Sequence, residues 1–246
     1  MKAIITFHSI DSSDSVLSFA PEMFSQLLAA FCESGFSIVG LRQLLDGDED
    51  RAVALTFDDG MQSVYRHALP ILKEYDAPSS LFLTTGPIGN SDKWPEANGQ
   101  SLSFPMLDWT EVEALHAAGV RIEGHTGSHP DMRALDASRI AEECNLADDL
   151  IEDRLGRRPQ FFAYPFGYHN TASRNFARNR YLASVTTELG ELGTSYDKAA
   201  IPRIDSYYLR SDWLARNLQS TPARTYLKLR SILRNVRGSQ CKADSP

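Results

Sequence analysis

The sequence predicts an α/β protein in which about seven parallel strands close into a barrel. Short apolar runs alternate along the chain with amphipathic helical patterns, as in repeated βα units. The runs are almost continuously apolar, which is typical of strands buried on both faces. The sequence contains neither a G-x-G-x-x-G loop nor a P-loop, so a barrel is favoured over an open nucleotide-binding sheet.

The elements can be assigned in order. The seven expected strands are residues 3–7, 36–39, 52–57, 79–85, 120–124, 161–164 and 182–187. The main helical patterns cover 21–36, 61–75, 108–120 and 135–156, the last with Asp136 as N-cap and Gly156 as its end. Residues 86–109 form a long irregular insertion, expected at the rim of the barrel.

Composition limits the classes of function. The chain has 246 residues, 42% of them hydrophobic, and a net charge of -7, which argues against nucleic-acid binding. Three cysteines without a CxxC spacing favour a reducing compartment, and the first apolar run is too short for a signal segment, so a cytoplasmic protein is expected. No linker precedes residue 205, so residues 1–205 are predicted to form the barrel domain and 206–246 a basic helical tail.

The first candidate site is Asp58-Asp59, at the end of the strand in "VALTFDDG". Asp-Gly can mark a hairpin turn. A helical pattern follows Gly60, however, so the pair is expected at a strand-to-helix connection, on the barrel edge where active sites collect.

The second candidate is "GHTGSHP", which follows another strand and supplies His125 and His129. The two could simply be hydrogen-bonded at a helix start. Two imidazoles and one carboxylate, however, suit zinc and leave one coordination position open for water. Because adjacent strand residues point in different directions, one aspartate would ligate the ion and the other would accept a proton.

"TFDDG", "HTGSHP" and "FFAYPFG" occur in the order found in the polysaccharide deacetylase family (carbohydrate esterase 4, NodB homology), which the chain resembles from "FHSI" to "IPRI". The resemblance implies a distorted, TIM-like (β/α) barrel that removes N-acetyl groups from amino sugars with a divalent metal, usually Zn²⁺. It also implies that Asp58 is the general base and that Asp59, His125 and His129 hold the metal.

The third motif, residues 162–167, is expected to face the substrate. The resemblance implies that the backbone N–H of Phe166 stabilises the oxyanion. Tyr164, Pro165 and Gly167 belong to the same motif and are predicted to contact the substrate, although packing at the rim would also explain them. Trp94, Trp109 and Tyr168 are expected in loops at the rim, where sugar rings could stack on them, although core packing would explain a lone aromatic equally well.

The chain departs from the better-known members in two ways. Ala163 stands where many of them carry an arginine, and Arg203 could replace it near the base or a substrate oxygen, or form a salt bridge that holds the last barrel segment. No histidine follows His169, so the late general acid is missing. His8 at the end of the first strand is the predicted replacement; a structural role for His8, or His169 as the acid, are the alternatives.

The tail reverses the charge of the chain, with eight Lys/Arg and one Asp between residues 210 and 242. Its apolar stripe would either pack on the barrel or touch an anionic membrane, which would suit a lipid-linked glycan.

The sequence thus predicts a hydrolase of non-peptide carbon–nitrogen bonds that deacetylates an amino-sugar glycan or glycan precursor. The alternatives are an amide or cyclic-imide hydrolase and a silent carbohydrate-binding module. The intact set of Asp58, Asp59, His125 and His129 argues against the silent module.

Overall fold

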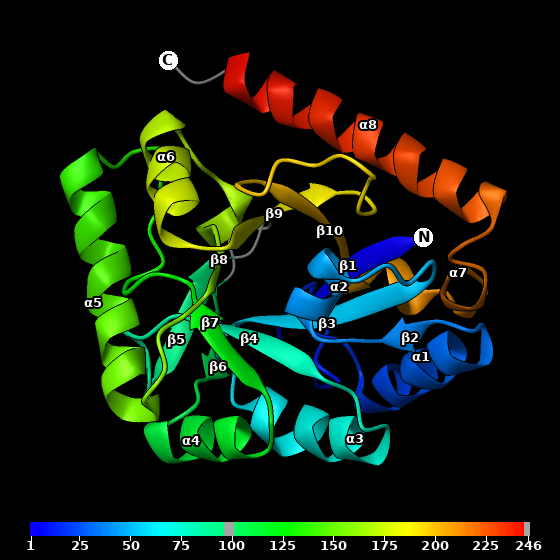
Figure 1. Cartoon of the computed structure of the whole chain (residues 1–246), viewed down its shortest axis with the longest axis horizontal. Helices are drawn as coiled ribbons and strands as arrows, with labels where there is room; N and C mark the ends of the chain where they lie inside the picture. Colours follow the sequence, from blue (N-terminus) through cyan, green and yellow to red (C-terminus); the bar gives the residue numbers. More distant parts are fainter. Residues whose placement is uncertain (96–100, 244–246) are drawn as a thin grey trace.

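A computed structural model describes residues 1–95 and 101–243, with side chains described for 1–90 and 103–234. Figure 1 shows a ring of strands enclosed by helices. The strands of the main sheet are β1 (Lys2–Phe7), β2 (Ser37–Ile38), β3 (Ala52–Asp59), β4 (Ser79–Leu83), β7 (Arg121–Gly124), β8 (Phe161–Ala163), β9 (Ala183–Leu189) and β10 (Ile201–Asp205).

The sheet closes into a seven-stranded parallel barrel, as predicted. The strand order is β1-β10-β9-β8-β7-β4-β3, and β3 pairs back onto β1 over its first six residues, 52–57. The closure is distorted, because β7 and β8 share a single register pair and the register of β9 and β10 shifts between Ile201 and Arg203.

Membership of the barrel differs from the prediction at one position. The run at 36–39 forms only the short β2, which pairs with the first two residues of β3 before β4 takes over that edge at Leu55. The seventh barrel strand is β10, whose sequence "IPRID" carries a proline and two charged residues and so lacks an apolar run.

The barrel is apolar on both faces, which explains the continuous strand patterns. Ile4 and Ala54 belong to the cluster inside the barrel with Phe82. Their neighbours Ile5 and Leu55 face outward, into the layer between strands and helices. Side chains from both faces of each strand are therefore removed from water, and this burial stabilises the barrel.

Helices connect most of the strands, whereas β9 leads to β10 through a loop and the last helices follow β10. The helices are α1 (Pro21–Glu33), α2 (Leu41–Asp46), η1 (Val64–Ala68), α3 (Leu69–Glu74), α4 (Trp109–Ala117), α5 (Ala137–Leu155), η2 (Pro165–Gly167), α6 (Thr171–Arg180), η3 (Ser206–Arg210), α7 (Asp212–Arg216) and α8 (Thr221–Ala243). The predicted caps of α5 are confirmed, since Asp136 accepts from the Arg139 N–H and Gly156 is left-handed at φ 68°. The short π-helix η1 precedes α3, where Pro70 lacks the N–H that a regular helix would use.

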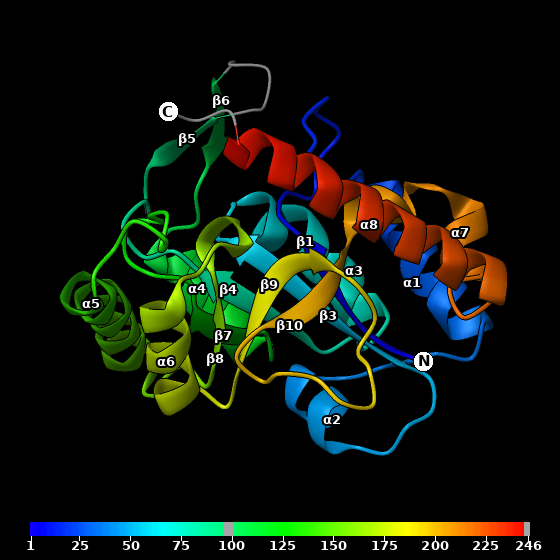
Figure 2. The same ribbon diagram turned by 90° about the horizontal axis from the view of Figure 1, so that it is seen from above.

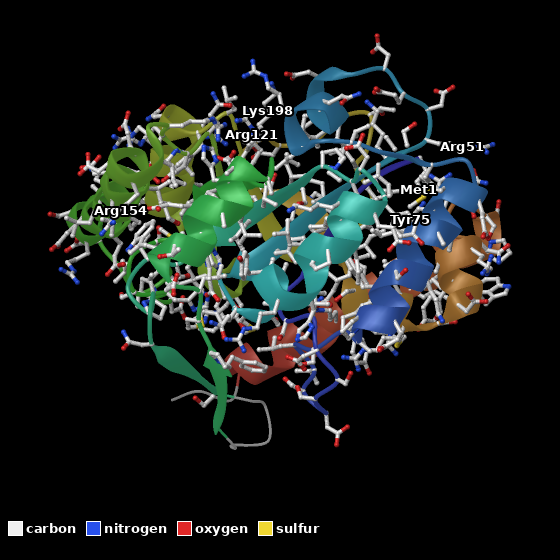
Figure 3. All side chains as sticks on the ribbon, turned by 90° about the horizontal axis from the view of Figure 1, so that it is seen from below. Met1, Arg51, Tyr75, Arg121, Arg154 and Lys198 are labelled. Carbon is white, nitrogen blue, oxygen red and sulfur yellow. The ribbon has the colours of Figure 1, made fainter. Side chains whose placement is uncertain are left out.

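The long insertion carries an antiparallel hairpin, β5 (Ser91–Pro95) and β6 (Ser101–Pro105). Figure 2 shows this hairpin projecting from the side of the molecule opposite the N-terminus. Met1, Arg51 and Arg121, each at or just before the start of a strand, lie away from the hairpin in Figure 3. The hairpin therefore stands on the rim formed by the carboxyl ends of the strands.

Helix α8 crosses the outside of the barrel near β9 (Figure 1). Ala223 and Leu227 of α8 are buried against the rest of the molecule. Across the part of the chain that the structure describes, no helix combines the length and apolar character needed to cross a membrane. The division into a barrel at 1–205 and a tail at 206–246 stays a prediction.

Candidate active site

The two motifs meet at the rim where β3 and β7 end. β3 ends at Asp59 and leads into the helical turn η1, so the predicted strand-to-helix connection is confirmed and the hairpin alternative is wrong. Residues 125–130 form a compact loop after β7. Since β4 alone separates β3 from β7, the parallel sheet brings both chain ends to one edge.

A tight turn separates the two adjacent carboxylates. Asp59 has φ 74°, and the Gly60 N–H donates to the Asp58 carbonyl at 2.9 Å, the i→i+2 bond of a γ-turn. The turn lets Asp58 face Arg203 while Asp59 faces the histidines. Both side chains are buried, so each depends on its own partner to remain ionised.

Asp59, His125 and His129 form a compact donor set. The Asp59 Oδ1 lies 3.2 Å from Nε2 of His125 and 3.4 Å from Nε2 of His129. One ligand atom from each residue lies within 4.8 Å of the other two. One carboxylate oxygen and two imidazole nitrogens at these separations fit a divalent cation such as Zn²⁺.

A backbone carbonyl sets the orientation of His125. Its Nδ1 lies 2.7 Å from the Ala163 carbonyl, so Nδ1–H donates there and Nε2 points toward the donor set. The sequence offered no signal for this contact, because any residue at position 163 supplies a carbonyl. Position 163, where the resemblance implies an arginine, therefore contributes its backbone carbonyl.

The electrostatics favour an ionised Asp59 and a neutral His129. Burial raises the pKa of Asp59, but the hydrogen bond with His125 and the charge of His8 outweigh it and lower that pKa. Burial lowers the pKa of His129 to about 4, so its imidazole is neutral at pH 7. For His125, burial lowers the pKa, yet the hydrogen bond to Asp59 and the nearby carboxylates raise it overall.

Backbone strain gathers at this rim. Five described non-glycine residues have positive φ, and four of them belong to the motifs: Asp59 at 74°, Thr126 at 66°, His129 at 56° and Phe166 at 57°. The fifth is Asp76, outside the motifs, at 47°. Such conformations cost free energy and persist where surrounding contacts impose them, as they do at functional sites.

Arg203 contacts the second carboxylate. Its Nη1 donates to Asp58 Oδ1 at 2.8 Å and its Nη2 to Oδ2 at 2.6 Å. Nε donates to the Thr186 carbonyl and Nη1 also to the Thr56 hydroxyl, so the guanidinium is held from three sides. Burial raises the pKa of Asp58, but the charge and hydrogen bonds of Arg203 lower it below the ordinary value. Arg203 therefore lies against Asp58, which is one of the positions predicted for it.

The third motif lies beside His129. The exposed ring of Phe166 is 4.5 Å from the His129 ring, and the Thr187 hydroxyl donates to the Phe166 carbonyl at 3.0 Å. Gly167 has φ 74°, and a Cβ there would meet Thr187 Oγ1 at 2.2 Å. The motif therefore requires glycine at this position, whereas Phe166 is accessible from the rim.

Two predicted substrate contacts are corrected. Tyr164 is buried and its hydroxyl donates to the Ala199 carbonyl at 2.9 Å, so its side chain belongs to the core. Pro165 is buried as well. Both side chains pack in the interior beneath the exposed part of the third motif. Trp94 lies in β5, and its side chain falls outside the described ones.

The two histidines considered as general acid occupy different surroundings. His8 follows β1 and is half-buried, and its charge acts on Asp58 and Asp59. His169 packs against the Tyr164 ring at 5.1 Å and lines a cavity of about 450 Å³ with Arg174. Of these two histidines, His8 is the one whose charge lowers the pKa of both aspartates, which fits its predicted role as the general acid.

Comparison with known proteins places these observations in a family. The profile described as polysaccharide deacetylase matches residues 46–183. YxkH of Bacillus subtilis, named as a polysaccharide deacetylase, is 24% identical over 208 residues, which are 82% of this chain and 70% of YxkH. The poly-beta-1,6-N-acetyl-D-glucosamine N-deacetylase of Staphylococcus aureus is 26% identical over 169 residues, 65% of this chain and 53% of that enzyme.

A solved structure has the same architecture. The deacetylase PplD of Streptococcus pyogenes, determined in complex with acetate, superposes with a TM-score of 0.74 at 25% identity. The superposition covers 89% of this chain and 96% of that one. The barrel described above is therefore the deacetylase fold.

Proposed function

The chain belongs to the polysaccharide deacetylase family, whose members hydrolyse amide bonds, and from this premise we propose a metal-dependent N-deacetylase of an amino-sugar glycan. The observation that carries the proposal is that the two adjacent aspartates have different partners at the rim. Asp59, His125 and His129 converge as a donor set, while the adjacent Asp58 faces Arg203.

The metal would be held by Asp59 Oδ1 and the Nε2 atoms of His125 and His129. A divalent ion there, most simply Zn²⁺, supplies Lewis acidity that activates water and polarises the scissile carbonyl. The Nδ1–H bond of His125 to Ala163 fixes the tautomer that such binding needs.

Asp58 acts as the general base. Its carboxylate is buried at the rim and kept ionised by two hydrogen bonds from Arg203, so it can accept a proton from the attacking water. Because Thr186 and Thr56 hold the guanidinium of Arg203, the base is held in one orientation before the substrate arrives.

Collapse of the tetrahedral intermediate needs an oxyanion donor and an acid. The N–H of Phe166, in a left-handed conformation beside His129, would donate to the oxyanion. His8 would protonate the departing amine. The half-buried position of His8 next to the two aspartates supports this role over His169.

The substrate class follows from chemistry and from relatives. Acetate is the product of deacetylation, and the staphylococcal relative is named for poly-beta-1,6-N-acetyl-D-glucosamine. Phe166 is exposed beside His129, and the exposed ring of Tyr168 lies 6.0 Å from that of Phe166, with Arg133 over one face of Tyr168 at 3.6 Å. Exposed aromatic faces at this place suit stacking on sugar rings.

Acetate release from β-1,6- and β-1,4-linked N-acetylglucosamine oligomers tests the proposal. Chelator-treated protein should release none, and added Zn²⁺ should restore release. Dihydrouracil, which contains a cyclic imide group, serves as the counter-substrate. Turnover of dihydrouracil alone would favour the imide-hydrolase alternative. Binding of the oligomers without turnover would favour the silent module.

We also propose that α8 touches an anionic membrane, bringing the rim to a lipid-linked or surface-held glycan. Tyr226, Leu229, Ile232 and Leu233 are exposed along α8. Lys228 and Arg230 accompany them on a chain of net charge -7, and basic residues beside an exposed apolar stripe suit anionic lipid.

Liposome sedimentation tests the membrane contact. Vesicles with anionic lipid should sediment the wild-type chain. They should not sediment the variant in which Leu229 and Ile232 are both replaced by serine. Equal sedimentation of both proteins, or equal binding to neutral vesicles, would contradict the contact. The cytoplasmic side remains our expectation for its location.

A further inference from the structure

Glu143 of α5 reaches the loop that carries the two histidines. Its Oε2 accepts from the N–H of Gly127 at 3.1 Å and of Ser128 at 2.8 Å, and its Oε1 accepts from the Ser128 hydroxyl at 2.8 Å. The Glu143 carbonyl also accepts from the Gly127 N–H at 3.1 Å. One side chain thus satisfies two consecutive amides of the loop immediately before His129.

Glu143 is almost completely buried, with 9% of the residue exposed. The nearest cation is Arg139, whose Nη2 is 3.9 Å from Oε1. Charge-assisted hydrogen bonds to backbone N–H groups are shorter and stronger than neutral ones. The carboxylate is therefore matched chiefly to the loop amides and not to a surface ion pair.

The loop needs such support because of its backbone. Thr126 and His129 both have positive φ, at 66° and 56°, and the Thr126 hydroxyl accepts from the His129 N–H at 3.1 Å. On the opposite side the Gly86 N–H donates to the Gly127 carbonyl at 2.7 Å. The segment between His125 and His129 is thus clamped between Glu143 and Gly86.

We infer that Glu143 is a positioning residue for the metal site. By fixing the amides of Gly127 and Ser128, it keeps Nε2 of His129 next to the Asp59 carboxylate. This inference rests on the metal site of the proposed function. It assigns to Glu143 no contact with substrate or metal. Loss of the carboxylate should let the loop leave its left-handed conformation and move His129 away from the other two ligands.

Competition between the full-length, metal-free chain and a chromophoric chelator for Zn²⁺ tests the inference. Glu143→Ala should weaken Zn²⁺ affinity by about 10- to 100-fold, the range typical of such supporting groups. Glu143→Gln should remain within a few-fold of wild type, because an amide oxygen can accept both N–H groups and the amide NH₂ can donate to the Ser128 hydroxyl. Rescue by glutamine would identify hydrogen bonding, and not net charge, as the cause.

Glu142→Ala is the matched control. Glu142 is adjacent, exposed and paired with Arg139 at 2.5 Å, so its removal should leave Zn²⁺ affinity unchanged. Ser128→Ala, which deletes only the hydroxyl contact, should give an intermediate loss. The absorption bands of the Co²⁺-loaded protein should change in Glu143→Ala and stay as in wild type for Glu143→Gln.

All affinities are measured below the unfolding temperature of each metal-free variant, verified by circular dichroism. If folded Glu143→Ala binds Zn²⁺ as tightly as wild type, Glu143 is merely structural and the inference is overturned, whatever its unfolding temperature. Failure of the wild-type chain to bind Zn²⁺ would instead contradict the proposed function, so the two failures are distinguishable.

Discussion

Arg203 donates to both carboxylate oxygens of Asp58, at 2.8 and 2.6 Å, although 145 residues separate them in the chain. The two come from β10 and β3, which do not pair with each other because β1 lies between them. The ion pair therefore crosses the interior of the closed barrel and ties its last strand to the proposed base.

Breaking this pair should destabilise the fold. Arg203→Met leaves a buried carboxylate unpaired, and we expect a loss of about 3 to 5 kcal/mol in the free energy of unfolding, measured by urea denaturation. Adding Asp58→Asn should recover part of that loss, since no charge then remains buried. Arg224→Met, which breaks the more exposed pair with Glu191, should cost less than about 1 kcal/mol. Equal costs for Arg203 and Arg224 would contradict the prediction.

The two adjacent aspartates should give different phenotypes. Asp58→Asn should keep Zn²⁺ bound but lower kcat for acetate release by about 10²- to 10⁴-fold, the range for loss of a general base. Asp59→Asn should weaken Zn²⁺ binding itself. Zinc content after dialysis and initial rates measure both; indistinguishable variants would refute the assigned roles.

Gly167 should tolerate no side chain. Its φ of 74° and the 2.2 Å approach of a Cβ to Thr187 Oγ1 predict that Gly167→Ala displaces the Phe166 turn, lowering both stability and turnover. Gly156→Ala is the matched control, with φ 68° and nothing within 4 Å of the added Cβ. The control should lower the free energy of unfolding by about 1 kcal/mol, from its left-handed backbone alone, and leave the rate of acetate release unchanged. A Gly167 variant no worse than the control would argue against the required close approach.

Asp148 should make stability depend on pH. Burial raises its pKa to about 6, against hydrogen bonds from Tyr181 and Arg180. A raised pKa means that the folded state favours the protonated acid, so this contribution is present below pH 4 and lost as pH rises through 6. Relative to wild type, Asp148→Asn should therefore gain about 2 to 3 kcal/mol between pH 4 and pH 7. Urea denaturation at both pH values measures it, and a pH-independent difference would count against the raised pKa.

The sequence predicted what depends on local pattern. In buried runs such as 52–57, the side chains alternate between the barrel interior and the helix layer. Both faces are therefore apolar, and the strand can be predicted from its continuous apolar pattern. The motifs around Asp58 and His125 were readable for the same reason, because each directly follows such a run. β10 was missed, since Pro202 and Arg203 interrupt its apolar character.

Contacts that depend on closure of the barrel have no local sequence pattern that predicts them. For Arg203 the sequence allows several placements, because its position beside Asp58 follows from the pairing of β10 and β3 with β1. The Ala163 carbonyl on His125 and the γ-turn at Asp59 are backbone features with no residue signature. Glu143 was assigned only to a helix, sixteen positions from the loop amide that it binds.

The most direct test of the central claim is a Zn²⁺ titration of the metal-free chain with acetate release from N-acetylglucosamine oligomers as readout. The rate should rise linearly and level off at one Zn²⁺ per chain, and His129→Ala should abolish the rise. Acetate release at full rate without any metal, or a normal titration in the His129 variant, would contradict a site built on Asp59, His125 and His129.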